Sequence, residues 1–222
     1  MFNNPSSHPH LVAKLVVFDM DGVLVDIESS WVHVHRHFGV NNDHSLHAYL
    51  RGEIDDLEFI RRDIQLWRDK DPQIDRNRVM DILSSAPIMP GAARTIRELK
   101  GAGVKTAIVS AGIDLLAERV AGRLGMDMHL ANGFVFDGKG RLSGEGVLNV
   151  RLMHKGDSVL EVARRFGVGK RDTVSVGNSS YDVSMFEKSG KGIAFCPSDD
   201  EVRAKAHAVV EEKDLSNILP LI

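Results

Sequence analysis

Short apolar runs without polar alternation recur along this sequence, and they predict strands that are covered on both faces. The runs span residues 15–18, 106–109, 173–176, 192–195 and 208–210. Helical patterns lie between them at residues 92–100, 114–124 and 156–166, and glycine follows each one. Alternating strands and helices predict an α/β fold with a Rossmann-like parallel sheet core.

Two segments interrupt this alternation. Residues 28–87 contain consecutive helical patterns with no strand between them, so we expect an inserted helical domain and a core domain made of residues 1–27 and 88–222. The strongest of these helices is expected at residues 53–70, where apolar residues share one face. A turn signal at residues 137–140, within an alternating apolar and polar stretch, predicts a β-hairpin at the edge of the sheet.

Composition narrows the possible partners and the compartment. The chain has 222 residues, of which 43% are hydrophobic, and a formal charge of −3. Without a basic excess, charge does not favour nucleic acid or a membrane surface, whereas a small metabolite fits. The single cysteine, Cys196, is expected to be a small buried side chain and fits a reducing compartment, so we expect a cytoplasmic protein. Residues 1–10 are expected to form a polar tail and not a secretory signal. The sequence leaves the oligomeric state open.

Polar residues follow the predicted strands at their carboxyl ends, which is where open parallel sheets bind ligands. Asp19 and Asp21 follow the first strand, in "VVFDMDGVLVD". A serine, an amide and a further carboxylate follow two other strands, and a lysine opens a helix; these residues are Ser110, Asn178, Asp182 and Lys155. We therefore expect all of them to converge on one site.

The four segments that carry these residues resemble, in their order and spacing, the motifs of the haloacid dehalogenase superfamily of phosphatases. The segments are "VVFDMDGVLVD", "IVSAG", the lysine of "MHKGD" and "VGNSSYDVSMF". The helical insertion stands where that superfamily has its cap, and the nearest likeness is to the phosphoserine phosphatase branch. The resemblance implies a Mg²⁺-dependent phosphomonoester hydrolase that acts on a small phosphorylated metabolite through an aspartyl-phosphate.

The resemblance also implies a role for each residue. Asp19 would be the nucleophile, and Asp21 would be the acid and base for the leaving group and for water. The phosphoryl group would be held by Ser110, the backbone of Ala111 and Gly112, and Lys155. Mg²⁺ would be held by Asp19, Asp21 through its carbonyl, Asn178 and Asp182, the second acid of that motif.

Three positions bear on substrate and metal. Glu28 stands where the phosphoserine branch receives the substrate ammonium group, so phosphoserine is the leading substrate. Asp63 stands where that branch has a carboxylate-binding arginine, which leaves a sugar phosphate or a phosphorylated amine open. Asn178 replaces a charged ligand, so weaker Mg²⁺ binding is expected, and a sensor that only binds a phosphorylated ligand also stays open. Retention of Asp19 and Asp21 argues against such a sensor.

Three histidines, His33, His35 and His37, raise the possibility of a zinc site. On a helix only His33 and His37 share a face, and two ligands do not complete such a site. We therefore expect these histidines to be solvated.

Overall fold

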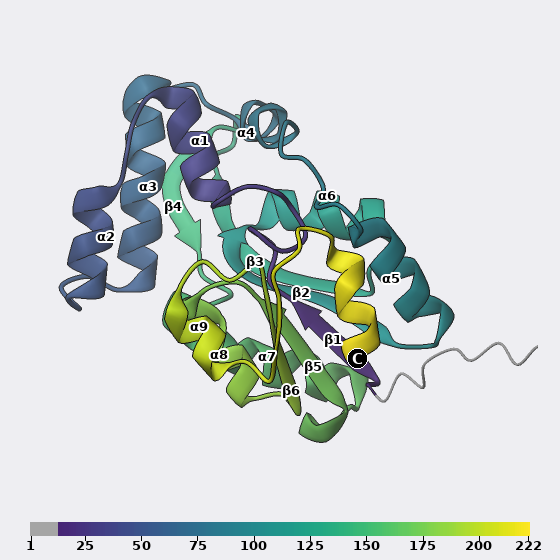
Figure 1. The fold of residues 1–222 in the computed structure, drawn as a ribbon. Helices are drawn as coiled ribbons and strands as arrows, with labels where there is room; N and C mark the ends of the chain where they lie inside the picture. The colour runs from purple at the N-terminus through teal and green to yellow at the C-terminus, as the bar shows by residue number, and fades with distance from the viewer. Residues whose placement is uncertain (1–12) are drawn as a thin grey trace, which may run out of the picture.

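A seven-stranded sheet forms the centre of the molecule in the computed structural model, which describes residues 13–222 (Figure 1). The strand order is β4-β3-β2-β1-β5-β6-β7, and all neighbouring pairs are parallel except β3 and β4. The strands are β1 (Leu15–Phe18), β2 (Lys105–Ile113), β3 (Met128–Phe136), β4 (Leu142–Val147), β5 (Thr173–Gly177), β6 (Lys191–Phe195) and β7 (Ala208–Val210). The predicted α/β fold with a parallel sheet is therefore confirmed, whereas the predicted polar tail lies outside the described residues.

Helices cover both faces of this sheet (Figure 1). One face packs against α7 (Lys155–Phe166), α8 (Val183–Glu187) and α9 (Asp200–Lys205). The other face packs against α5 (Ala92–Gly101), α6 (Asp114–Leu124) and the C-terminal 3-10 segment Leu215–Leu221. Alternate residues of β1 point to the two sides, with Leu15 and Val17 in one apolar cluster and Val16 and Phe18 in the other. Burial on both faces explains why the strands are almost wholly apolar.

Five helices lie between β1 and β2, and we give the name cap to residues 28–87, which contain the first four of these helices. The four cap helices are α1 (Ser30–Phe38), α2 (Asp43–Leu50), α3 (Asp56–Lys70) and α4 (Arg76–Leu83). The helix expected to begin at residue 53 begins three residues later, so that boundary was wrong. The Asp55 side chain accepts the backbone N–H of Glu58 at 2.8 Å, which places the N-cap at Asp55 and leaves Ile54 outside the helix.

The predicted edge hairpin is present as β3 and β4, and it connects the sheet to the cap. In the turn, Asp137 accepts backbone hydrogen bonds from Lys139 and Arg141 at 2.8 and 3.0 Å. Strand β4 then packs against α3 of the cap, where a Cβ at Gly146 would lie 2.3 Å from the Ile60 side chain. The hairpin therefore supports the cap as well as closing the sheet edge.

One apolar cluster runs from the sheet into the cap. Trp31 of α1 stacks on Trp67 of α3 with ring centroids 5.5 Å apart, and Phe134 of β3 meets both rings edge to face. These residues belong to the same cluster as the β1 side chains Val16 and Phe18. Because the cap and the sheet share buried surface, the cap is held over the sheet by hydrophobic burial. Within residues 13–222, no helix is both long and apolar enough to cross a membrane.

A buried amide of β3 connects the end of β2 to the segment that follows β4. Asn132, 3% exposed, donates to the Ala111 and Val150 carbonyls at 3.2 and 2.9 Å, and its Oδ1 accepts the backbone N–H groups of Asn149 and Val150, each at 2.9 Å. All the hydrogen-bonding positions of this amide are thereby used. Nothing in the sequence pattern marked Asn132 as important.

We predict that Asn132→Ala lowers the free energy of unfolding by about 2 kcal/mol or more, because it leaves several buried backbone groups without a hydrogen-bond partner. Denaturant unfolding of the variant and the wild type measures the difference. Asn217→Ala is the control, since the Asn217 side chain donates to the exposed Glu212 carboxylate and its backbone bond does not depend on the side chain; it should change stability by less than about 0.5 kcal/mol. Equal effects of the two substitutions would contradict this account.

Candidate active site

A cavity of about 630 Å³ lies between the carboxyl ends of the central strands and the cap. Most of the residues singled out from the sequence line it, namely Asp19, Asp21, Glu28, Asp63, Ser110, Ala111, Gly112, Lys155 and Asn178. Asp182 does not line the cavity and is fully buried. The site is thus built where the strand directions bring separate motifs together.

Three buried charges form the floor of the site. Lys155 opens α7, and its Nζ lies 2.7 Å from Asp182 Oδ1 and 3.1 Å from Asp19 Oδ1. Burial raises the pKa of Asp19, and Asp182 raises it further, while Lys155 opposes both effects. Burial disfavours the charge on Lys155, but Asp182 and Asp19 outweigh it and raise the pKa of the amine. Lys155 therefore stays charged, and one cation serves two carboxylates.

Asp21 is held by Ser30, the first residue of α1. Its Oδ2 accepts the Ser30 backbone N–H at 2.7 Å and the Ser30 hydroxyl at 2.8 Å, while the backbone N–H of Ile113 donates to that hydroxyl at 2.9 Å. Burial raises the pKa of Asp21, and the bonds from Ser30 act against that rise. Sequence reasoning missed Ser30. Ser30 stands at the start of a helix, where polar residues are common, so its position did not indicate a role in the site.

Two glycines let the walls of the site approach one another. A Cβ at Gly112 would lie 2.7 Å from Asp21 Oδ2 and 2.6 Å from Ser30 Oγ. Gly22 has φ of 76°, a left-handed conformation, and a Cβ there would lie 2.2 Å from Asn178 Nδ2. Both positions therefore depend on the absence of a side chain.

Ser110 has its hydroxyl proton available for a ligand. The residue is 2% exposed, and its Oγ accepts the Gly112 backbone N–H at 3.1 Å. A hydroxyl that accepts one bond can still donate its own proton. Ser110 lines the same cavity as Asp19 and Lys155, so an anionic group bound there would meet both a donor and a cation.

The predicted metal-binding role of Asp182 does not agree with its surroundings. Oδ2 accepts the backbone N–H groups of Asn178 and Ser179 at 2.9 and 3.1 Å, and Oδ1 accepts from Lys155. Both oxygens are already engaged inside the protein. The structure therefore places Asp182 as a positioning residue for Asn178 and Lys155, and this corrects the prediction of direct ligation.

A hard divalent cation fits the oxygen atoms that remain. Asp19 Oδ1 and Asp21 Oδ1 are buried, and neither accepts a well-aligned hydrogen bond from any described residue. The Asn178 amide lies against Gly22, next to both aspartates in the cavity wall. Carboxylate, carbonyl and amide oxygens are donors that suit Mg²⁺. Nowhere in residues 13–222 do three His, Cys, Asp or Glu side chains gather as a metal cluster.

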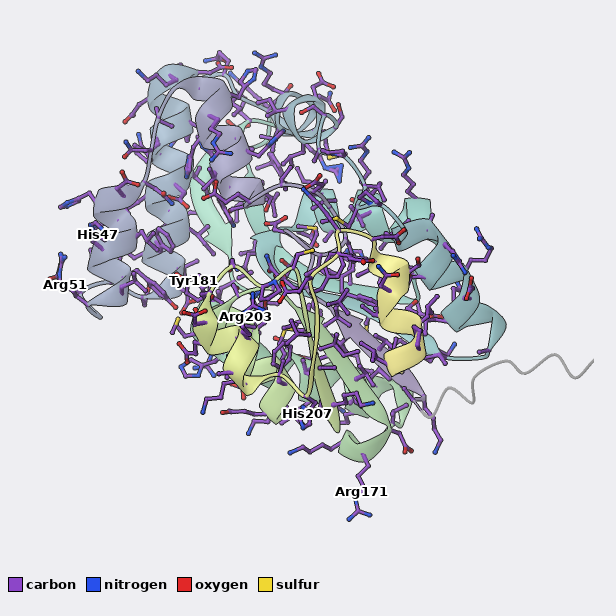
Figure 2. The ribbon with its side chains drawn as sticks, in the orientation of Figure 1. His47, Arg51, Arg171, Tyr181, Arg203 and His207 are labelled. Atoms are coloured by element: carbon purple, nitrogen blue, oxygen red, sulfur yellow. The ribbon has the colours of Figure 1, made fainter. Side chains whose placement is uncertain are left out.

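The cap contributes the outer wall of the cavity. Glu28 is 65% exposed and forms an ion pair with Arg36. The Asp56 carboxylate accepts the Tyr49 hydroxyl at 3.1 Å and the Leu152 backbone N–H at 2.8 Å, and this second bond links the cap to the core. Tyr181, which also lines the cavity, lies between the cap helices and α9 (Figure 2).

Two expectations about single residues were wrong. His35 is 1% exposed and not solvated, because it is packed between α1 and α3 against Trp67. Cys196 is only half-buried, lines the cavity, and has φ of 43°, a strained conformation for a residue with a side chain. The helical spacing of His35 could not show that its side chain is buried, and the residue type of Cys196 could not show that its side chain is partly exposed.

Comparisons with known proteins agree with this geometry. Phosphoserine phosphatase of Methanocaldococcus jannaschii is 32% identical over 214 residues, which cover 94% of this chain and 97% of the relative. Phosphoserine phosphatase of Wolinella succinogenes is 31% identical over 209 residues, which cover 93% and 98%. A solved structure of a phospho-aspartyl intermediate analogue of phosphoserine phosphatase superimposes with a TM-score of 0.78 at 30% identity, covering 95% of this chain and 99% of the other. A substrate-bound phosphoserine phosphatase gives a TM-score of 0.79 at 29% identity, covering 95% and 98%.

The sequence model for haloacid dehalogenase-like hydrolases matches residues 16–187, a range that contains β1 from its second residue, the cap and all of the cavity-floor residues. With its α/β fold, its paired aspartates after β1 and its buried lysine, this chain belongs to the haloacid dehalogenase-like hydrolase family.

Proposed function

We propose that this protein is a Mg²⁺-dependent phosphomonoesterase that works through an aspartyl-phosphate on Asp19. The observation that carries the proposal is the placement of Asp19 beside Lys155, with Asp21 and Ser110 on the same cavity. The similar proteins named phosphoserine phosphatase, one of them solved as a phospho-aspartyl analogue, support it. We further propose that residues 28–87 act as a cap domain on a core of residues 1–27 and 88–222.

In the first step, an oxygen of Asp19 attacks phosphorus and the bond to the leaving oxygen breaks. Asp21 gives its proton to the leaving alkoxide, which suits a carboxyl whose pKa is raised by burial. Water then attacks the phosphoryl group, gives a proton to Asp21, and releases Asp19 with inorganic phosphate. The bonds from Ser30 keep Asp21 oriented through both steps.

The phosphoryl oxygens would be held by groups of the core. Lys155 supplies a fixed positive charge, and the Ser110 hydroxyl donates a hydrogen bond. The backbone N–H groups of Ala111 and Gly112 belong to the end of β2, which Asn132 contacts through the Ala111 carbonyl. Asp19, the Asp21 carbonyl and Asn178 would hold Mg²⁺. When bound, the ion screens the repulsion between the attacking carboxylate and the phosphate.

The substrate is a small phosphorylated metabolite in this proposal. Phosphoserine is the first candidate because of the names of the similar proteins, and because Glu28 lies at the cavity, where it could meet a substrate amine. A phosphorylated amine or a sugar phosphate is the second candidate, and the buried carboxylate of Asp63 on the cavity wall favours it.

We predict that Asp19→Asn abolishes turnover and leaves the fold intact, because an amide keeps the shape of the nucleophile but not its reactivity. A panel of phosphomonoesters assayed with Mg²⁺ and with EDTA measures turnover, and circular dichroism follows the fold. Asp172→Asn, which changes an exposed carboxylate paired with Lys14, is the control and should keep wild-type rates. Residual Asp19→Asn activity within about tenfold of wild type, about 1.4 kcal/mol of barrier, would exclude the covalent mechanism.

We predict that Asn178→Asp tightens Mg²⁺ binding, because it adds a charged oxygen ligand to the site. Calorimetric titration of Mg²⁺ into each protein measures the dissociation constant directly, and activity at limiting Mg²⁺ should rise in parallel. Asn217→Asp adds the same charge at a half-buried position near the C-terminus that does not line the cavity, and it should leave the constant unchanged. Unaltered or weaker binding by Asn178→Asp would show that Asn178 is not a ligand.

A further inference from the structure

A buried carboxylate of the cap faces the cavity without a complete set of partners. Asp63 of α3 is 2% exposed and lines the same cavity as Asp19. Its Oδ2 accepts a hydrogen bond from Asn42 Nδ2 at 3.3 Å, whereas its Oδ1 accepts no well-aligned bond from any residue that the structure describes. A buried carboxylate oxygen without a donor is destabilising. A ligand with hydrogen-bond donors would complete this site.

The neighbouring histidine does not supply the missing charge. Trp67 Nε1 donates to His35 Nδ1 at 2.7 Å, and an indole N–H can only donate. The ring of His35 therefore carries its single proton on Nε2, which lies 3.5 Å from Asp63 Oδ1. A second ring proton on Nδ1 would collide with the Trp67 donor, so this contact favours a neutral imidazole. Burial raises the pKa of Asp63, and the contacts with His35 and Asn42 offset that rise only in part.

The cap wall of the cavity is acidic. Of the described cap residues that line it, Glu28, Asp56 and Asp63 carry carboxylates and none is lysine or arginine. The two lining lysines come from the core and are already paired, Lys155 with Asp19 and Asp182 and Lys213 with Asp26 at 2.6 Å. A substrate carboxylate that reached the cap would therefore meet like charge and no free cation among these residues.

Asp63 differs from the other two carboxylates because, among the described residues, its Oδ1 is met only by the His35 Nε2–H group at a long distance of 3.5 Å. Glu28 is exposed and paired with Arg36, and Asp56 already accepts bonds from Tyr49 and Leu152. Asp63 is more deeply buried than Glu28, so an ion pair there is less screened by water. These differences favour Asp63 over Glu28 as the residue that would contact a substrate amine.

We propose that Asp63 is the specificity-determining residue that binds an ammonium group of the substrate, and that the substrate is a phosphate monoester of an amino alcohol without a carboxylate. This inference rests on the phosphomonoesterase function proposed above. An ammonium group supplies both N–H donors and the positive charge that Asp63 lacks. The same wall excludes an anionic leaving group.

Three esters on a two-carbon scaffold test this proposal in the wild-type protein with Mg²⁺. Phosphoethanolamine carries the ammonium group, 2-hydroxyethyl phosphate replaces it with a hydroxyl, and phosphoserine adds a carboxylate. We expect kcat/KM for phosphoethanolamine to exceed the value for each of the other two at least tenfold. This comparison needs no variant, so it holds even where a substitution disturbs folding.

Asp63→Asn then removes the charge and keeps the shape. We expect it to lower kcat/KM for phosphoethanolamine at least tenfold, with less than a threefold change for 2-hydroxyethyl phosphate. Asp69→Asn is the matched control, because Asp69 lies on the same helix but is exposed and accepts a bond only from Gln65. It should leave all three values within twofold of wild type.

The possible outcomes separate this inference from the function on which it rests. Preference for phosphoserine, equal rates for the amine and the hydroxyl ester, or an equal loss on all esters in Asp63→Asn would overturn the amine-binding role of Asp63. No Mg²⁺-dependent turnover of these esters or of p-nitrophenyl phosphate would overturn the proposed phosphatase function itself.

Discussion

The ion pairs of Lys155 are the interaction on which the active site depends. A lysine and two aspartates are buried together at the carboxyl end of β1, where any one of them alone would be strongly destabilising. Asp182 is held in turn by backbone N–H groups of the segment after β5, so the charges link three separate parts of the chain. The nucleophile is positioned by this set of contacts and not by β1 alone.

The cap and the core contribute different properties to one cavity. The core supplies the paired aspartates, the lysine and the serine, which are suited to phosphoryl transfer. The cap supplies an acidic wall and the aromatic cluster of Trp31 and Trp67, which is continuous with the sheet's own hydrophobic core. Ser30 joins the two, because one hydroxyl contacts both Asp21 and the backbone after Ser110. A shift of the cap would therefore disturb the acid and base as well as the substrate wall.

The core and the cap bear on different parts of the function. The similarity to phosphoserine phosphatases extends over nearly the whole chain, and the family match includes the floor residues Asp19, Lys155 and Asp182. Substrate choice depends on contacts beyond the phosphate, where a single charged side chain can discriminate between substrates. In the specificity that we propose, Asp63, with its neighbours His35 and Asn42, is that side chain.

The sequence by itself determined the α/β alternation, the helical insertion, the edge hairpin and the residues that meet at the strand ends. Buried parallel strands have an unmistakable apolar pattern, and the carboxyl ends of such strands must share one edge of the sheet. Only the tertiary structure decided the roles of Ser30 and Asn132, the burial of His35, and the engagement of Asp182 by backbone donors. The reason is that these roles arise mainly from contacts between distant segments, such as Ser30 with Ile113 or His35 with Trp67. Local periodicity indicates which face of an element is buried. It does not indicate which polar group from a distant segment contacts that face.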